Sequence, residues 1–146
     1  MDEMKLIKGV ILTKLKTVES TEGAVLRYLR YNDKGFNEFK EAYFSTVKKD
    51  KIKPWKRHLK MTLNIAVPIG KIKFVLYDER TSSPTRKIFN QYILSPENFY
   101  RLTVPPNVWM AFRGLEKENL LANTADLIHD PDEVERKDLG YFNYEV

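Results

Sequence analysis

The chain has 146 residues, of which 42% are hydrophobic, and its 25 basic and 20 acidic side chains give a formal charge of +5. This length corresponds to about one domain, and the hydrophobic share excludes an intrinsically disordered chain. The absence of cysteine excludes disulfides, thiolate nucleophiles and cysteine-based zinc sites, and two histidines, His58 and His129, leave little for an imidazole metal site. No apolar run reaches the roughly 18–20 residues that a membrane helix needs. We therefore expect one cytoplasmic domain over residues 1–146, without a membrane partner.

Nine short segments rich in β-branched and aromatic residues, separated by turn residues, predict an all-β domain. They span residues 6–15, 24–31, 42–47, 61–67, 71–78, 88–94, 100–104, 108–113 and 119–125. Pro68 and Gly70 predict a hairpin turn between the fourth and fifth of these strands. The fifth strand alternates with period two, which predicts one buried face.

One short helix is expected near the C-terminus. Asp130 is a good N-cap, Pro131 suits the first helical position, and Glu133 follows the cap by three residues. This is the arrangement of a capping box, and it predicts a helix that ends at about Lys137.

Basic residues gather in one part of the chain, between Lys48 and Lys60. They are Lys48, Lys49, Lys51, Lys53, Lys56, Arg57 and Lys60, with Asp50 as the one acid among them. Such a run is typical of an edge strand protected by lysines, of a phosphate site, or of a nucleic-acid surface. Composition alone does not separate these three interpretations.

His58 follows this basic run directly. Neighbouring lysines and arginines lower the proton affinity of an imidazole, which keeps it neutral and able to act as a general base. A lone histidine is also common as a structural residue, and we expect His129, beside Asp130 and Pro131, to be a loop residue of that kind.

Several local strings point to a known family by their order and spacing. They are Tyr43-Phe44-Ser45, His58 at the end of the basic run, the Gly70 turn, Arg80 followed by Ser83-Pro84-Thr85, Leu94-Ser95-Pro96-Glu97-Asn98, Leu102-Thr103-Val104-Pro105-Pro106 and Thr124-Ala125-Asp126. From about Gly9 to Asp138 the chain resembles the dTDP-4-dehydrorhamnose 3,5-epimerase family. The resemblance implies a cupin-like jelly-roll barrel of two packed antiparallel sheets, which pairs into a homodimer and binds a nucleotide-linked 4-keto-6-deoxy sugar without a cofactor.

In this family a histidine removes a proton from the carbon beside the ketone, and an aspartate orients that histidine. The resemblance assigns these roles to His58 and Asp126. A lysine stabilises the enolate, a role for which Lys60 is the candidate.

A tyrosine of the family returns the proton from the opposite face, and Ala122 occupies its aligned position. We therefore expect Tyr92, Tyr77 or water to return the proton. For the substrate itself, we expect Lys53, Lys56 and Arg57 to contact the diphosphate, with Trp55 or Tyr43 near the base or sugar. These five residues are the predicted binding set.

Three functions remain open from the sequence. The first is an epimerase or isomerase of a nucleotide-linked 4-keto-6-deoxy sugar. The second is a non-catalytic binding or accessory protein with the same fold, because fold alone does not imply function. The third is a nucleic-acid binder that uses the basic run, which the lack of aromatic pairs at strand spacing disfavours.

Overall fold

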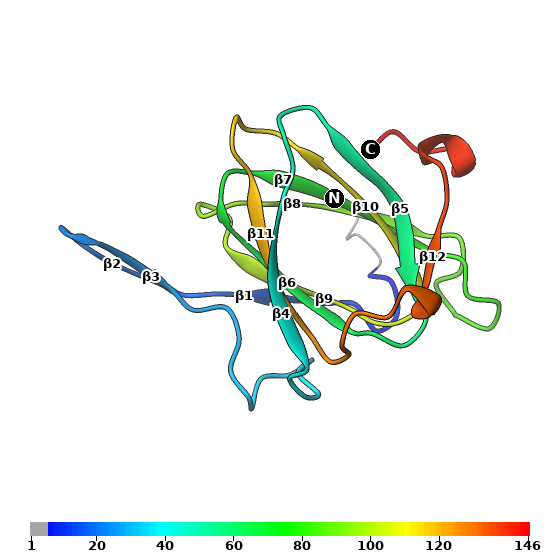
Figure 1. Cartoon of the computed structure of the whole chain (residues 1–146), viewed down its shortest axis with the longest axis horizontal. Helices are drawn as coiled ribbons and strands as arrows, with labels where there is room; N and C mark the ends of the chain where they lie inside the picture. Colours follow the sequence, from blue (N-terminus) through cyan, green and yellow to red (C-terminus); the bar gives the residue numbers. More distant parts are fainter. Residues whose placement is uncertain (1–5) are drawn as a thin grey trace.

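The computed structural model describes residues 6–146 as strands joined by turns and two single-turn 3₁₀ helices (Figure 1). The strands are β1 (Ile11–Lys14), β2 (Thr17–Ser20), β3 (Gly23–Leu26), β4 (Glu41–Thr46), β5 (Ile52–His58), β6 (Leu63–Ile69), β7 (Ile72–Asp78), β8 (Phe89–Leu94), β9 (Tyr100–Val104), β10 (Val108–Gly114), β11 (Leu120–Ala125) and β12 (Val134–Arg136), and the 3₁₀ helices are η1 (Pro131–Glu133) and η2 (Leu139–Tyr141). Within the described range, neither helical turn has the length to cross a membrane.

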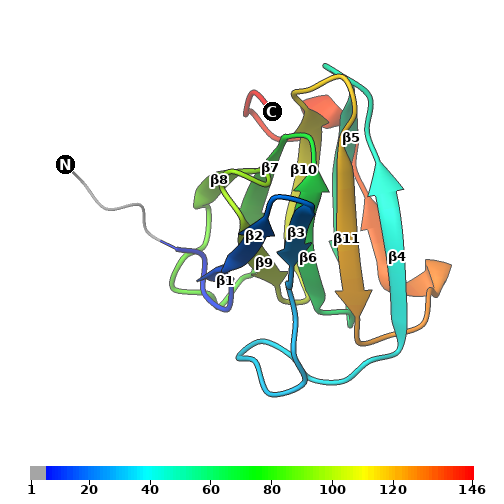
Figure 2. The same ribbon diagram turned by 90° about the vertical axis from the view of Figure 1, so that its left-hand side faces the viewer.

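Two five-stranded antiparallel sheets pack face to face and form the barrel (Figure 2). The first sheet has the strand order β1-β9-β6-β11-β4, and the second sheet has the order β12-β5-β10-β7-β8. The remaining two strands, β2 and β3, form a hairpin that projects away from the barrel (Figure 1). The expected all-β jelly roll is therefore confirmed.

The turn at Pro68 and Gly70 does not form the predicted hairpin. It carries the chain from one sheet to the other, because β6 pairs with β9 and β11 whereas β7 pairs with β10 and β8. Gly70 has a φ of +83°, and a Cβ placed on it would lie 2.1 Å from the carbonyl oxygen of Glu118. The tight turn between the sheets therefore requires glycine at this position.

One face of β7 is buried, as its alternation predicts, and the other face is partly buried. Ile72, Phe74 and Leu76 are fully buried in the core between the sheets. The other face lies under the C-terminal segment, where Phe142 and Val146 pack on the outer side of the second sheet. The C-terminal residues thus stabilise the sheet that carries the basic run.

The predicted C-terminal helix is wrong beyond its first turn. Asp130 does cap this turn, since its side chain accepts a hydrogen bond from the backbone N–H of Asp132 at 3.0 Å. Residues Val134–Arg136 then pair with β5 as strand β12, so they are not free to continue a helix. The carboxylate of Glu133 is buried beside the end of β5 instead of returning to the cap.

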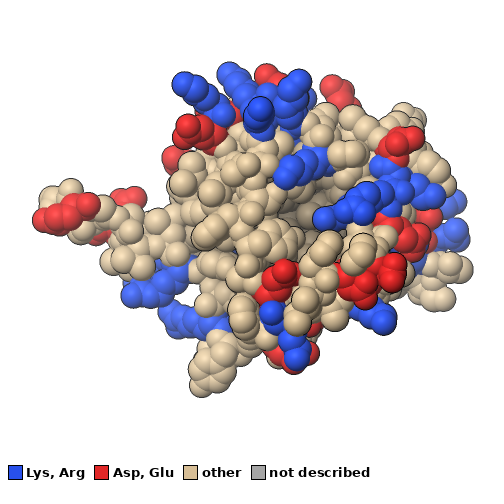
Figure 3. All heavy atoms as spheres, viewed as in Figure 1, with Lys and Arg blue, Asp and Glu red and all other residues tan. Residues whose placement is uncertain are grey.

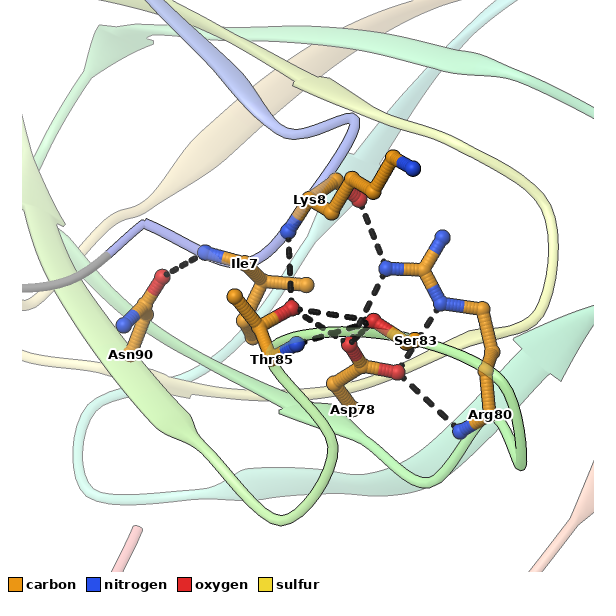
Figure 4. A network of polar contacts seen from close by, with 7 residues as sticks. All are labelled: Ile7, Lys8, Asp78, Arg80, Ser83, Thr85 and Asn90. Carbon is orange, nitrogen blue, oxygen red and sulfur yellow. Dashed lines mark hydrogen bonds and ion pairs between the residues drawn. The ribbon is translucent and has the colours of Figure 1, made fainter.

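A buried polar network around Asp78 holds the side chains of Arg80, Ser83 and Thr85, which form one of the strings that resemble the family (Figure 4). The carboxylate of Asp78 accepts hydrogen bonds from the Arg80 guanidinium at 2.9 Å and from the hydroxyls of Ser83 and Thr85 at 2.5 and 2.7 Å. Burial raises the pKa of Asp78, but these three donors together hold it below its ordinary value. Thr85 also accepts from the backbone N–H of Lys8 at 2.9 Å, so the network fixes the β7–β8 loop to the N-terminal segment. Its role is structural.

Candidate functional site

Strand β5 occupies the basic run, where none of the predicted strands lies. Its register with β10 places Met110 opposite Lys56 and Phe112 opposite Lys53, so β5 has one extra residue over this stretch. This β-bulge surrounds Pro54, which has no N–H to give to a ladder. Because the bulge changes the alternation, the side chains of Lys53, Lys56 and His58 share the inner face of the strand.

A cavity of about 860 Å³ lies between the two sheets on this inner face. Its wall is made by Glu41, Tyr43, Ser45, Lys53, Pro54, Trp55, Lys56, His58, Met61, Leu63, Ile65, Met110, Phe112, Leu121, His129, Arg136, Lys137, Asp138 and Tyr141. Figure 3 shows a hollow near the middle of the face of the molecule in view, with basic side chains beside it. The volume and the mixture of apolar floor and polar wall suit a small-molecule ligand. Among residues 6–146 no group of three or more His, Asp or Glu side chains is placed to bind a metal ion.

His58 and Glu133 form a buried pair at the edge of this cavity. The Nδ1 atom of His58 lies 2.5 Å from Oε1 of Glu133, and the two side chains are 8% and 2% exposed. The other oxygen, Oε2, accepts hydrogen bonds from the backbone N–H groups of Leu59, Lys60 and Met61 at 3.1 to 3.3 Å. The carboxylate is therefore fixed by the chain that follows β5.

The environment of this pair favours a neutral imidazole and an ionised carboxylate. Burial lowers the pKa of His58, and the charges of Lys56 and Arg136 lower it further, while the hydrogen bond and charge of Glu133 act in the opposite direction. Burial raises the pKa of Glu133, but the hydrogen bonds from His58 and from the backbone bring it below its ordinary value. With Nδ1–H donating to Glu133, the lone pair of the imidazole is left on Nε2. Within the described residues Nε2 has no hydrogen-bond partner.

Positive charge lines the same side of the cavity. Arg136 lies opposite Lys56 in the β12–β5 register, so the two side chains share a face, and both line the cavity. Burial lowers the pKa of Lys56, and the charges of Arg136 and Lys53 lower it further. Lys53 itself reaches across to the first sheet, where its ammonium donates to the hydroxyl of Ser45 at 2.7 Å.

Arg57, predicted to contact the diphosphate, points away from the cavity. Its guanidinium pairs with Glu135 at 3.0 Å and lies 4.7 Å from the ring centroid of Trp109, on the outer face of the second sheet. Trp55 is placed differently from the prediction as well. Its indole is fully buried, packs against Phe142 and donates to the carbonyl of Leu139 at 3.2 Å, so the ring belongs to the outer cluster of the second sheet although the residue contributes to the cavity wall.

Two of the three predicted catalytic residues, Lys60 and Asp126, do not line the cavity. Lys60 is exposed and does not line the cavity; it contributes only its backbone N–H, which donates to Glu133. Asp126 accepts hydrogen bonds from the backbone of Thr62 at 2.7 Å and from the side chain of Asn37 at 3.1 Å. The carboxylate that contacts His58 is Glu133, and Asp126 instead fixes the loop before β4 to the start of β6.

The tyrosines around the barrel also differ from expectation. The hydroxyl of Tyr92 donates to Asn90 at 3.1 Å in the core, and Tyr77 stacks on Phe89 on the outer face of the second sheet. Neither lines the cavity, whereas Tyr43 does. Ala122 pairs with the exposed Phe44, so its side chain is on the outer face of the first sheet.

Comparison with known proteins agrees with the fold. No family model matches the chain. A crystal structure of a dTDP sugar isomerase from Desulfovibrio desulfuricans G20 is 39% identical, with a TM-score of 0.89 over 92% of this chain and 87% of that chain. The dTDP-4-dehydrorhamnose 3,5-epimerase from Sulfolobus tokodaii has the same fold, with 24% identity and a TM-score of 0.85 over 97% of this chain and 84% of that chain.

A curated relative from Haloferax volcanii has the name "Probable low-salt glycan biosynthesis epimerase Agl13". It is 26% identical over 102 residues, which are 68% of this chain and 65% of the relative. The alignment therefore spans slightly less than two thirds of that protein. By its similarity to the Desulfovibrio enzyme over nearly its whole length, the chain belongs to the family of dTDP-sugar isomerases and epimerases.

Proposed function

We propose that this protein is an epimerase or isomerase of a dTDP-linked 4-keto-6-deoxy sugar. The observation that carries the proposal is the His58–Glu133 pair: His58 lines a cavity of substrate size, and its buried Nε2 has no hydrogen-bond partner among the described residues. A neutral imidazole that is oriented by an ionised carboxylate is a suitable general base for a carbon acid.

The reaction begins at the carbon beside the ketone. Nε2 of His58 takes the proton, the C–H electron pair forms a C=C bond, and the carbonyl pair moves onto oxygen as an enolate. A carbon acid of this kind is much weaker than imidazolium, so the enolate oxygen needs a cation beside it. Lys56 lies on the same face of β5 two residues before His58, and we assign to it the role for which the family resemblance suggested Lys60.

The diphosphate is expected at the basic wall next to the base. The wall receives Arg136 from β12, Lys137 from the segment that follows β12, and Lys53 from β5. Arginine binds phosphate oxygens with two parallel hydrogen bonds, which gives orientation as well as affinity. This arrangement would hold the sugar ring between the two sheets.

Replacing Arg136 tests the diphosphate site. We expect Arg136→Gln to weaken the binding of dTDP by about 10- to 100-fold in calorimetry, since a hydrogen bond to a charged group contributes about 1.5–3 kcal/mol. Arg57→Gln is the matched control, because Arg57 pairs with the neighbouring β12 residue on the opposite face of the same strand pair. Equal affinities of Arg136→Gln and the wild type, or a loss in the control alone, would refute the placement.

Exchange with solvent tests the reaction itself. In D₂O the wild-type protein should introduce deuterium from solvent at the carbon beside the ketone of dTDP-4-keto-6-deoxyglucose, which NMR follows directly. Binding of dTDP without any exchange would contradict an epimerase or isomerase and leave the non-catalytic alternative.

We also infer a homodimer. The β2–β3 hairpin extends from the barrel with Val18 and Val25 46% and 49% exposed, and Phe44 on the outer face of the first sheet is 74% exposed. A second copy of the chain would cover such apolar side chains. Light scattering should give twice the mass of 17.2 kDa, and a monomer at micromolar concentration would contradict the inference. The cytoplasmic location stays a prediction from the sequence.

A further inference from the structure

Inversion at a carbon needs two proton-transfer groups, one on each face of the sugar. His58 belongs to the second sheet, and the cavity separates it from the first sheet. If His58 removes the proton, the group that returns it must lie on the opposite face of the sugar, and the first sheet forms the wall across the cavity from β5. The proposed function leaves this group unassigned, since Ala122 faces outward.

The first sheet supplies six residues to the cavity wall, which are Glu41, Tyr43 and Ser45 from β4, Leu63 and Ile65 from β6, and Leu121 from β11. The three aliphatic side chains have no proton to give. The carboxylate of Glu41 accepts a hydrogen bond from the backbone N–H of His129 at 3.0 Å. The hydroxyl of Ser45 accepts a hydrogen bond from the ammonium of Lys53 and, as an alcohol, is a much weaker acid than a phenol. Among these six residues, Tyr43 is therefore the one suited to act as the acid.

We propose that Tyr43 is the acid that returns the proton to the sugar carbon, on the face opposite to His58. The inference rests on the proposed function and adds the residue that the reaction still lacks. In the register of β4 and β11, Tyr43 lies opposite Asn123. The next pair on the same face, two residues along each strand, is Ser45 with Leu121, and both of these residues line the cavity. The side chain of Tyr43 therefore shares the inner face of the first sheet.

The state of this phenol suits the task. Burial raises the pKa of Tyr43, and the charges of Glu41 and Glu133 raise it further, against the effect of a hydrogen bond with Asn123. The phenol therefore keeps its proton at neutral pH. When that proton moves to carbon, the C=C electron pair forms the new C–H bond, the ketone is restored and a phenolate remains. With 37% of the residue exposed, the phenolate can regain its proton from water.

The test is Tyr43→Phe, assayed in D₂O with dTDP-4-keto-6-deoxyglucose as the probe. We expect formation of the epimer to fall by about 100-fold or more, in line with the usual contribution of a general acid. Exchange at the same carbon should persist without inversion, because His58 still removes the proton and returns deuterium on its own face. This separation of exchange from inversion would not arise from a merely structural role.

Tyr77→Phe is the matched control. Tyr77 does not line the cavity, and its ring stacks on Phe89 on the outer face of the second sheet. The Tyr77→Phe variant should form the epimer at a rate near that of the wild type. Inversion at the wild-type rate in Tyr43→Phe would overturn the proposal, as would a loss of both exchange and dTDP binding, which would make Tyr43 a binding residue. If the wild type shows no exchange, the proposed function itself fails, an outcome distinct from these.

Discussion

Replacement of His58 by Asn should reduce the exchange of the sugar proton by about 10²- to 10⁴-fold, the range expected when a general base is removed. Asparagine retains a polar group near Glu133 but has no lone pair that can accept a proton from carbon. The binding of dTDP should remain close to that of the wild type, because the basic wall of Lys53, Arg136 and Lys137 is left intact. Exchange at the wild-type rate in this variant would remove His58 from the mechanism.

The pH dependence of the wild type provides a second readout for the same residue. Burial and the charges of Lys56 and Arg136 lower the pKa of His58, so the imidazole stays neutral to a lower pH than an exposed histidine. The acid limb of kcat/KM should therefore lie below about pH 6.5, the ordinary value for histidine. A limb above this value would show that the charge of Glu133 outweighs burial.

Replacement of Glu133 by Gln should slow the reaction by roughly 10- to 1,000-fold, less than the ~10⁴-fold loss known when the carboxylate of a catalytic triad is made an amide. The Gln oxygen can still accept from the backbone of residues 59–61, in which case its NH₂ group faces His58. Nδ1 must then accept a hydrogen bond, so the imidazole proton moves to Nε2 and blocks the base. Loss of the negative charge also lowers the pKa of His58, and the acid limb should move to lower pH while the maximal rate falls.

Asp126→Asn is the control for this experiment, since Asp126 is the carboxylate that the sequence assigns to the same role. Its contacts are with Thr62 and Asn37, away from His58. We expect little change in its exchange rate at a temperature where the variant is folded. A larger loss in Asp126→Asn than in Glu133→Gln would restore the original assignment.

The fold and the place of His58 at the cavity could be predicted from the sequence, because both depend on local signals. Period-two runs and turn residues predict strands, and the order of the strings around His58 and Ser83 identifies the family. Strand β5 is missed because Pro54 and a dense run of lysines are typical of a loop, and only the bulge opposite β10 accommodates them. The prediction of a hairpin at Gly70 is wrong because no local signal distinguishes a turn within a sheet from a turn between sheets.

Glu133 is missed for a related reason. Its spacing from Asp130 is typical of a capping box, and that local interpretation accounts for the carboxylate without a distant partner. The pairing of β12 with β5, which brings Glu133 to His58 and Arg136 to Lys56, joins residues more than 70 positions apart. A buried carboxylate at such a contact is a tertiary feature, and no spacing along the chain encodes it.

Everything proposed for the cavity depends on where His58 carries its proton. The sequence has two histidines, so ¹⁵N NMR of the histidine-labelled protein, with a His129→Gln variant for assignment, resolves His58 directly. At pH 7 we expect a neutral ring with the proton on Nδ1 and an unprotonated Nε2, and a pKa below 6.5 when the pH is lowered. A ring that is protonated at pH 7, or that carries its proton on Nε2, would contradict the assignment of His58 as the base.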